Sequence, residues 1–460
     1  MRPLLTAYLF FPLYYGPWEV VRYLRKLEKS QWYSPQEIER IQLKKLRALV
    51  KHAYDNVPFY HEKFRERGLK PEDISNLRDL RKLPIIKKDD LKANFPNRVI
   101  ARDHNIKDLL RASTSGSTGK PFTRYMDRRA AWFARAARRR FESWYGLYPG
   151  IRYVTLRSRA PSTRERLIFS YSPSIRGRLT DIMKRRLLLV TWKITRKTLR
   201  EFSILLRQYK PKVLRGNVSL LFTLASLFKK YDISDIRPTA VVAYGETLFD
   251  FQRRLIESVF DCRVFDYYGS AEFDPIAEEC EEHSGLHIDA EDRIVEFIRG
   301  EENVSFGEEG EITITDLNNY AMPFIRYNIE DMGIPTGERC ACGRGLPLIR
   351  ELKGRLCDLI VTKDGGLVPG LFFNLPAPYI FRNYEWIQQY QIIQPSREKL
   401  LIRIVKFAEP KNEDLKYLIN GVRKYLGDIE VETEFVDSIP TAPSGKHRFI
   451  ISKVAHELFK

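Results

Sequence analysis

Cysteine is scarce in this chain, with five among 460 residues. A small, odd number of cysteines in a chain of this length excludes a disulfide framework of the kind that staples small secreted domains. The scarcity indicates a reducing compartment, and we expect a cytoplasmic protein. Internal repeats and low-complexity tracts are lacking too, which excludes repeat architectures.

Long hydrophobic runs are also lacking. The most apolar stretch, residues 4–24, is interrupted by Pro12 and Pro17 and carries Arg22. It is short for a membrane-spanning helix and contains no small-residue cleavage site, so we predict neither a transmembrane segment nor a cleaved leader. Two interpretations remain for the N-terminal segment, residues 1–34. It lies peripherally on the inner face of the membrane, or it packs as a strap on the protein's own core.

Acidic residues are too few to balance the basic ones: 59 Asp and Glu stand against 78 Lys and Arg, a formal net charge of +19. Such an excess favours an anionic membrane surface, an anionic substrate or nucleic acid as a partner. Eleven arginines lie between Arg128 and Arg166, and we expect the helix at 129–144 to present its arginines on a solvated face. No helix-turn-helix, zinc-finger or RNA-binding signature accompanies the charge, so we expect no specific nucleic-acid partner.

The length and the residue pattern favour a multidomain α/β protein, because 460 residues exceed what one hydrophobic core serves. A helix is predicted at 35–54, where Ser34 can cap the first turn and Pro35 suits its start. Strands at 152–158 and 241–245 alternate with helical stretches, which indicates a sheet with ligand-binding loops at its strand ends. Later segments predict a small sheet-and-helix domain, with strands at 400–407 and 431–437 and a helix at 413–427.

The densest cluster of hydroxyls and glycines lies at residues 112–121, with the sequence ASTSGSTGKP. Its hydroxyls can donate to phosphate oxygens, its glycines let the backbone come close to a ligand, and its lysine adds a positive charge. A Walker A loop is excluded, because that motif requires Gly at Thr114 and Ser or Thr at Pro121. We predict a phosphate-binding loop, with a flexible Ser/Gly linker as the alternative.

Four further motifs follow in order: YYGSAE at 267–272, NYAMPFIRYNIEDMG at 319–333, GRLCDLI at 354–360 and PTAPSGKHR at 440–448. Together with the loop they resemble the adenylate-forming superfamily of acyl-CoA synthetases over roughly residues 40–455. The residues of these motifs are most similar to those of the phenylacetate-CoA ligase family, and within it to the branch often found with capsular polysaccharide genes.

This resemblance implies an α/β fold with three parts. After the N-terminal segment 1–34, a large adenylate-forming domain of sheets and helices would span residues 35–354, and a small mobile α+β domain would span residues 355–460. It implies ATP-dependent adenylation of a carboxylic acid, then transfer of the acyl group to a thiol, most simply CoA, with Mg²⁺ as cofactor. A place in capsular or cell-surface polysaccharide biosynthesis is implied as well. The identity of the acid, the acceptor and the oligomeric state are left open.

The resemblance also assigns roles to residues. The loop from Ser113 to Lys120 would hold the β- and γ-phosphates, with Thr118 as the closest hydroxyl and Lys120 as the charge. Glu272 would bind magnesium, and Lys446 would reach the forming acyl phosphate. The implied nucleotide-binding residues are Ser113, Thr114, Ser115, Gly116, Ser117, Thr118, Gly119, Lys120, Gly245, Glu246, Tyr268, Gly269, Ser270, Asp331 and Arg355.

Several of these assignments carry a specific function. Tyr268 would flank the adenine, with Gly245 and Glu246 on its other side, and Ser270 would reach the α-phosphate. Asp331 would accept hydrogen bonds from both ribose hydroxyls, although Ile329 and Glu330 precede it where relatives have Thr-Gly. Arg355 would contact the nucleotide near the hinge, where Cys357 replaces a residue that is often Asp or Lys.

Soft metal ligands lie between these motifs. Cys280, His287, Cys340 and Cys342 are ligands of the kind that zinc takes tetrahedrally, and His283 is a rival to His287. A site of four protein ligands would brace the fold and leave no open position for catalysis. Buried thiols with an unrelated surface histidine are the alternative.

Two other functions compete with the ligase. One is an adenylyl transferase that stops at the adenylate, or adenylates a hydroxyl as a related branch does to a deazaflavin coenzyme. The other is a basic, membrane-associated scaffold without turnover. The presence of Lys120, Glu272, Asp331 and Lys446 argues against the scaffold.

Overall fold

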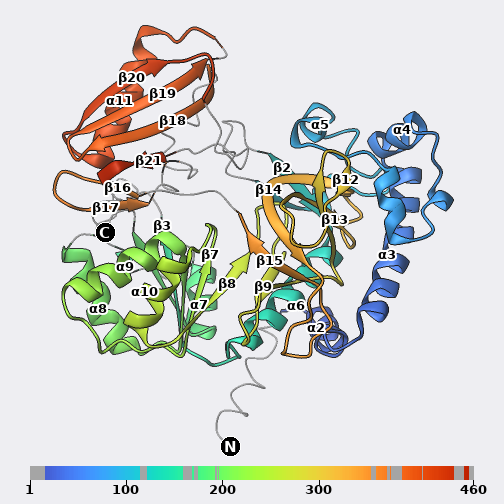
Figure 1. The fold of residues 1–460 in the computed structure, drawn as a ribbon, viewed down its shortest axis with the longest axis horizontal. Helices are drawn as coiled ribbons and strands as arrows, with labels where there is room; N and C mark the ends of the chain where they lie inside the picture. The colour runs from blue at the N-terminus through green and yellow to red at the C-terminus, as the bar shows by residue number, and fades with distance from the viewer. Residues whose placement is uncertain are drawn as a thin grey trace, which may run out of the picture. The chain divides into compact units, whose positions relative to one another are not determined.

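The computed structural model describes residues 16–113, 122–158, 168–169, 175–191, 194, 196–353, 359–369, 373, 386–406, 408–439 and 450–454 (Figure 1). Its contacts group the chain into two compact units that are not continuous in sequence. Unit 1 comprises Met1–Thr114, Phe122–Pro149 and Phe265–Gly354, and unit 2 comprises Ser115–Pro121, Gly150–Val264 and Arg355–Lys460. The predicted domain boundaries at 34/35 and 354/355 stay a prediction.

Unit 1 contains most of the helices near the N-terminus. They are α2 (Trp18–Ser30), α3 (Pro35–Asn56), α4 (Pro58–Glu66), α5 (Lys88–Ala93) and α6 (Arg128–Trp144), with short 3₁₀ turns at Pro71–Asp73, Leu77–Lys82 and Ile106–Asp108. Helix α3 begins at Pro35, where the Ser34 hydroxyl accepts from the Glu37 N–H and the Glu37 carboxylate accepts from the Ser34 N–H. This capping box explains why the start of α3 was readable from the sequence.

Helices α2 and α6 pack against each other. Val20, Leu24 and Leu27 of α2 are buried with Phe133 and two alanines of α6. The small alanines let the two backbones come close, while Asp127 caps α6 by accepting from the Ala130 N–H at 2.8 Å. The buried face of α2 therefore fits the predicted strap, and residues 1–15 lie outside the described residues.

The sheet of unit 1 runs in the order β12-β11-β13-β14-β15-β10-β9-β8. Its strands are β8 (Arg263–Tyr268), β9 (Ala277–Glu279), β10 (Leu286–Ile288), β11 (Arg293–Arg299), β12 (Glu302–Asn303), β13 (Gly310–Asp316), β14 (Tyr327–Thr336) and β15 (Leu348–Leu352). A separate antiparallel pair, β1 (Leu110–Ser113) and β2 (Thr123–Met126), aligns Ser113 with Thr123. This register brings the two ends of the predicted phosphate loop together.

Unit 2 contains a second series of strands in the order β7-β6-β3-β5-β4. The strands are β3 (Tyr153–Ser158), β4 (Ile168–Phe169), β5 (Arg186–Thr191), β6 (Val213–Asn217) and β7 (Ala240–Tyr244), and the helices are α7 (Ile175–Met183), α8 (Arg196–Tyr209), α9 (Val218–Lys230) and α10 (Asp250–Phe260). Strands β3, β5, β6 and β7 are mutually parallel, as the predicted alternation of strands and helices requires.

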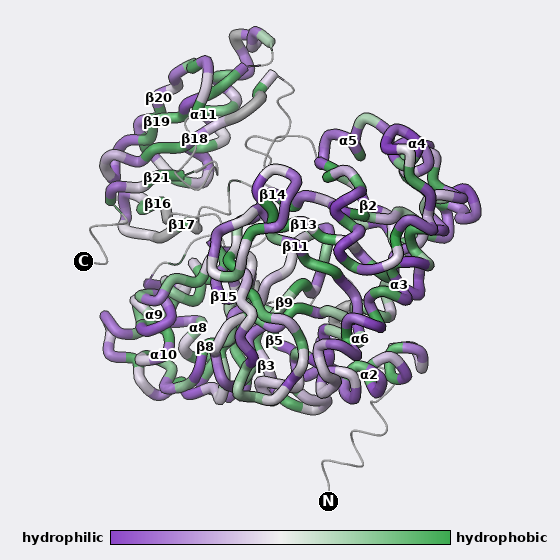
Figure 2. The backbone as a smooth tube through the Cα atoms, turned by 45° about the vertical axis from the view of Figure 1, so that its right-hand side comes forward, coloured by the Kyte–Doolittle hydropathy of each residue, from purple (hydrophilic) through white to green (hydrophobic). Residues whose placement is uncertain are grey.

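The later part of unit 2 forms a four-stranded sheet in the order β20-β19-β18-β21. Its elements are β18 (Ile387–Ser396), β19 (Lys399–Lys406), α11 (Asn412–Leu426), β20 (Glu430–Phe435) and β21 (Ile450–Ser452), and β16 (Leu359–Val361) pairs with β17 (Leu367–Pro369). Leu418, Val422 and Leu426 of α11 are buried against the apolar face of this sheet. Figure 2 colours β19 mainly as hydrophobic. The predicted small sheet-and-helix region is confirmed.

None of the helices in the described ranges is long and apolar enough to span a bilayer.

Candidate functional site

Two of the residues assigned to the nucleoside meet in unit 1. Tyr268 ends β8 and Asp331 lies on β14, 63 positions later, yet the Tyr268 hydroxyl donates to Oδ2 of Asp331 at 2.9 Å. Tyr268 is buried in the hydrophobic core of unit 1, which fixes its ring. An aromatic ring beside a carboxylate can stack on a base and accept from ribose hydroxyls.

The rest of the YYGSAE motif forms a tight turn after β8. The Ser270 hydroxyl oxygen accepts from the N–H groups of Glu272 at 3.1 Å and Phe273 at 3.0 Å. At Gly269, a Cβ atom would lie 3.2 Å from both Oδ1 of Asp274 and the Tyr267 ring, so a side chain would crowd the turn. The Ser270 hydroxyl thus already holds the turn in which Glu272 lies.

Glu272 is 8% exposed, and its carboxylate interacts electrostatically with Arg124 of β2. Its backbone carbonyl accepts from the Arg124 guanidinium of β2. Burial raises the pKa of the neighbouring Tyr327, and the charge of Glu272 raises it further. A buried carboxylate normally requires a cationic or hydrogen-bonding partner, so this geometry fits a metal ligand.

Arg138 and Asp274, to which the sequence analysis assigned no role, stabilise this turn by contacts from outside it. Arg138 of α6 forms an ion pair with Asp274, and the Tyr267 hydroxyl donates to the same carboxylate. Asp274 follows the motif by two positions, which was the only available signal.

The expectation that the arginines of α6 lie on a solvated face is wrong for Arg140. Its side chain is fully buried and pairs with Asp289 at 2.8 Å and Glu291 at 2.8 Å. The partners lie about 150 positions away in the sequence, so the local pattern could not reveal them.

Gly245 and Glu246 lie in unit 2, directly after β7. Gly245 has a φ of +79°, and a Cβ there would lie 2.7 Å from the Asn217 amide nitrogen, so glycine is required. The Glu246 carboxylate accepts from the Ser219 N–H at 2.6 Å and from the Ser219 hydroxyl at 2.8 Å, at the start of α9. Burial raises the pKa of Glu246 to about 7.

Several assigned residues lie outside the described residues: Thr114, Ser115, Gly116, Ser117, Thr118, Gly119, Lys120, Arg355 and Lys446. Ser113 is described as the last residue of β1. The roles assigned to Ser113 and to these other residues stay predictions.

The four soft metal ligands come together in unit 1. Cys280 follows β9, His287 lies on β10, and Cys340 and Cys342 lie in the loop between β14 and β15. One ligand atom from each residue lies within 4.8 Å of the other three. The sulfurs of Cys280 and Cys340 are 3.5 Å apart, and the Cys342 sulfur is 3.4 Å from Nε2 of His287. Ligands of a tetrahedral zinc ion, at about 2.0–2.3 Å from the metal, lie about 3.5 Å from one another.

The surroundings of this cluster suit a metal. Nδ1 of His287 lies 3.4 Å from the Leu346 carbonyl, which can only accept, so Nε2 carries the lone pair that faces Cys342. Burial lowers the pKa of His287 to about 4 and raises the pKa of Cys280. The buried site therefore disfavours an isolated thiolate, and a cation would supply the missing charge.

His283 is not part of this cluster. Its Nδ1 lies 3.3 Å from the Glu279 carboxylate, and its ring packs on Phe265 at 4.8 Å.

Gly345 explains the tight loop beside the cysteines, because its N–H donates to the Gln31 carbonyl and a Cβ would collide with the Tyr33 carbonyl at 1.8 Å.

Comparison with known proteins confirms the predicted resemblance. A family model described as the CapK C-terminal domain matches residues 360–453. Protein CapK of Staphylococcus aureus is 25% identical over 418 residues, which cover 87% of this chain and 86% of that protein. Phenylacetate-coenzyme A ligase of Pseudomonas putida is 28% identical over 367 residues, covering 75% of this chain and 76% of that protein.

Solved structures confirm the fold. A crystal structure of 2-hydroxyisobutyryl-CoA ligase, in complex with 2-HIB-AMP and CoA in the thioesterification state, matches with a TM-score of 0.62 and 20% identity. The match covers 92% of this chain and 91% of that one. The fold is therefore that of the adenylate-forming CoA ligases.

Proposed function

We propose that this protein, a homologue of Protein CapK and of the phenylacetate-coenzyme A ligases, is an AMP-forming acid–thiol ligase. It joins a carboxylic acid to the α-phosphate of ATP, releases pyrophosphate, and passes the acyl group to a thiol, CoA. The observation that carries this proposal is the hydrogen bond between Tyr268 and Asp331, because two separate motifs that the resemblance assigns to the nucleoside meet in one place.

The chemistry of the first step explains the residues. When a carboxylate attacks the α-phosphate, negative charge grows on crowded oxygens, so catalysis depends on fixed positive groups and orientation. We assign Lys446 to the reacting oxygens and Lys120 to the β- and γ-phosphates. The nearly buried carboxylate of Glu272 suits Mg²⁺, which prefers carboxylate and phosphate oxygens and would neutralise the pyrophosphate leaving group.

The test is exchange of labelled pyrophosphate into ATP by the full chain, with a panel of carboxylic acids and Mg²⁺. We expect exchange that depends on one class of acid and thioester formation when CoA is added. Asp331→Asn keeps the shape of the residue and removes its charge, so it should raise the KM for ATP. Adenylate that accumulates without passing to any thiol would favour the adenylyl transferase, and absence of exchange with every acid would favour the scaffold.

We extend the proposal to capsular or cell-surface polysaccharide biosynthesis, the setting of the branch that the sequence resembles. Similarity to Protein CapK over most of both chains supports this setting.

We further propose a structural zinc ion at Cys280, His287, Cys340 and Cys342. The ligand spacing and the orientation of His287 support it. The ion would tie the β9–β10 hairpin to the loop before β15.

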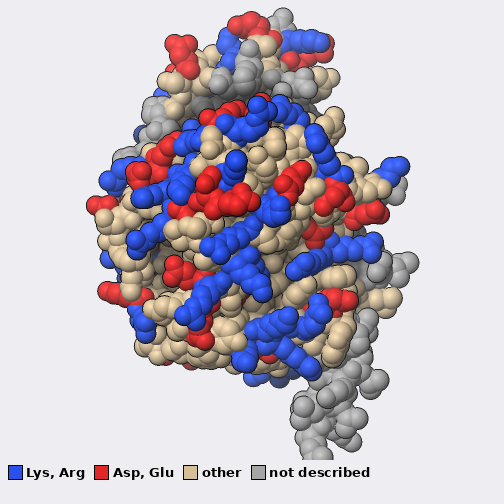
Figure 3. Space-filling view, turned by 90° about the vertical axis from the view of Figure 1, so that its right-hand side faces the viewer, with Lys and Arg blue, Asp and Glu red and all other residues tan. Residues whose placement is uncertain are grey.

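Peripheral membrane association is proposed for the outer face of α2. Trp18, Arg22, Arg25 and Lys29 are exposed and recur at the spacing of one helix face, and Trp18 is 63% exposed. Figure 3 shows Lys and Arg side chains interspersed with Asp and Glu on the face that lies to the right in Figure 1. Exposed tryptophan beside cations suits the headgroup region of an anionic bilayer.

A further inference from the structure

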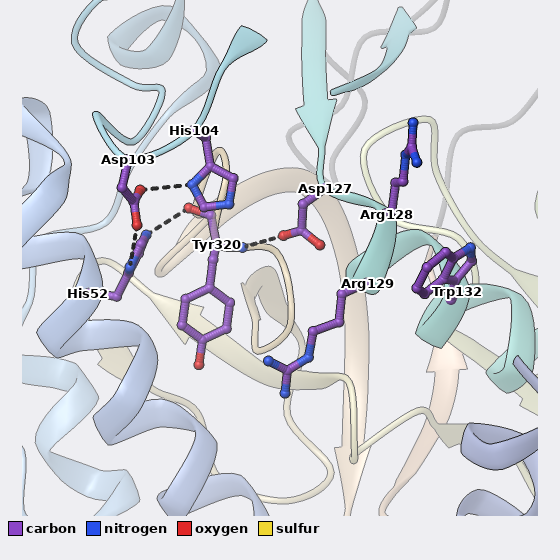
Figure 4. A pocket seen from close by; sticks show the side chains of 8 residues that line it. All are labelled: His52, Asp103, His104, Asp127, Arg128, Arg129, Trp132 and Tyr320. Carbon is purple, nitrogen blue, oxygen red and sulfur yellow. Dashed lines mark hydrogen bonds and ion pairs between the residues drawn. The ribbon is translucent and has the colours of Figure 1, made fainter. Parts of the chain in front are cut away.

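A pocket of about 480 Å³ lies in unit 1, and none of the residues assigned to the nucleotide lines it (Figure 4). Its walls come from segments far apart in the sequence. His52 projects from α3, Asp103 and His104 come from the turn before β1, and Asp127 precedes α6. Tyr320 closes the pocket between them.

His52, Asp103 and His104 converge on one side of this pocket. One ligand atom from each lies within 4.8 Å of the other two. Nδ1 of His52 is 3.8 Å from Oδ2 of Asp103, and Nδ1 of His104 is 2.8 Å from Oδ1 of the same carboxylate. Ligands about 2.1 Å from a common ion lie about 3–4 Å apart, so rotations of the exposed Asp103 and the half-buried His104 complete the set.

The hydrogen bonds of His52 orient it as a ligand. Its Nε2 lies 3.0 Å from the Tyr320 carbonyl, which can only accept, so Nε2 carries the proton. Nδ1 therefore holds a lone pair, which accepts from the Asn56 amide at 3.3 Å. The Asn56 amide also donates to the His52 carbonyl at 3.2 Å and keeps that partner when Nδ1 binds an ion. A ligating histidine is held in this way, with its second nitrogen on a carbonyl.

The charges around Tyr320 are mixed, because Arg129 lines the pocket together with Asp103 and Asp127. The Asp127 carboxylate accepts from the Tyr320 N–H at 3.2 Å, so two carboxylates border the region around Tyr320. Figure 4 shows Arg128 and Trp132 on the opposite side, with Arg128 pointing away from the two histidines. An anion would face the carboxylate of Asp103 at the point where the histidines meet.

We propose that His52, Asp103 and His104 form a binding site for a divalent transition-metal ion. Two imidazoles and one carboxylate are a donor set that takes zinc or a similar ion and leaves positions open for water or another ligand. The site is distinct from the cysteine cluster and shares no residue with it.

Such an ion would connect α3 to the start of the strand pair β1 and β2. Asp103 and His104 precede β1 by a short 3₁₀ turn, and Asp127 directly follows β2. Because these strands flank residues 114–121, the ion would brace the base of the predicted phosphate loop. Binding only to the folded chain would also raise its melting temperature.

The experiment measures Zn²⁺ bound by the metal-stripped full chain at a series of buffered free-zinc concentrations. His104→Ala should lose one equivalent of zinc relative to the unmodified chain, or bind it at least about tenfold more weakly. His61→Ala is the matched control, because His61 is an exposed histidine nearby that lies only against the Tyr54 carbonyl and ring. Its zinc binding should equal that of the unmodified chain.

A second variant separates ligand loss from misfolding. Asp103→Asn keeps the size of the side chain, so it should fold and still lose the same equivalent, and the zinc-dependent rise in melting temperature should shrink with it. Zinc binding by both variants that matches the unmodified chain at every free concentration would overturn the proposal. Equal loss in His61→Ala would also overturn it, because binding would then be a general property of surface histidines. Because cysteines 280, 340 and 342 are intact in every variant, loss of the other proposed zinc cannot mimic the result.

Discussion

Glu246 offers a test in which the size of the effect follows from the structure. Its carboxylate is held by Ser219 at the start of α9, and burial raises its pKa from 4.5 to about 7. A raised pKa means that the folded chain holds this proton more tightly than the unfolded chain. Below pH 4.5 the carboxyl group is protonated in both the folded and the unfolded chain, so it does not lower the free energy of unfolding. As the pH rises from 4.5 to 7, the unfolded state loses its proton first, so stability falls.

The magnitude follows from the difference between the two pKa values. At about 1.4 kcal/mol for each pH unit, an increase from 4.5 to about 7 corresponds to about 3 kcal/mol. Glu246 is partly exposed, so this value is an upper bound. Glu246→Gln mimics the protonated acid without a titrating group. We expect it to match the unmodified chain near pH 4.5 and to be more stable by up to about 3 kcal/mol at pH 8.

The assay is chemical denaturation of both proteins between pH 4.5 and 8, followed by a probe of unit 2, because a chain of two units need not unfold in one step. Ser219→Ala is a useful companion, since it removes one donor and leaves the carboxylate to titrate. A stability difference between Glu246→Gln and the unmodified chain that stays constant with pH would refute the reasoning. ATP binding should not change, because the family resemblance assigns the backbone at 245–246 to the nucleotide.

Four further predictions concern the proposed sites. Glu272→Gln should raise the Mg²⁺ concentration needed for adenylation, and an unchanged magnesium titration would place the metal elsewhere. Lys446→Ala should slow pyrophosphate exchange by about two to four powers of ten while still converting a supplied acyl-adenylate to thioester, and normal exchange would contradict its assignment. Cys340→Ser should lower the zinc content by about one per chain and lower the melting temperature, whereas a metal-free, fully stable unmodified chain would end the zinc proposal. Replacing Arg22 and Arg25 with alanine should weaken binding to anionic vesicles by about 30-fold, at about 1 kcal/mol per charge, and equal binding to zwitterionic vesicles would speak against the proposed face.

Features that depend on neighbouring residues were predictable from the sequence. The start of α3 follows from Ser34, Pro35 and Glu37, which lie within one helical turn. The alternation of strands and helices also predicted an α/β sheet, and the parallel strands of unit 2 have the helical connections that such a sheet requires. The order of the five motifs indicated the family, and the comparisons confirmed it.

Choices between similar candidates were decided only by tertiary structure. His283 and His287 are four positions apart and chemically identical, but the pairing of β10 with both β9 and β15 places His287 opposite the cysteines. In the same way, Arg140 lies within a run of arginines and is buried only because Asp289 and Glu291 return from the sheet to meet it.

The convergence of His52, Asp103 and His104 had no sequence signal at all, because α3 and the turn before β1 are separated by about 50 residues. The sequence by itself determined local elements and the motifs that identify the chemistry. Tertiary structure decided which side chains share a site, because the free energy of burying a charge or a ligand depends on partners that the chain brings from far away.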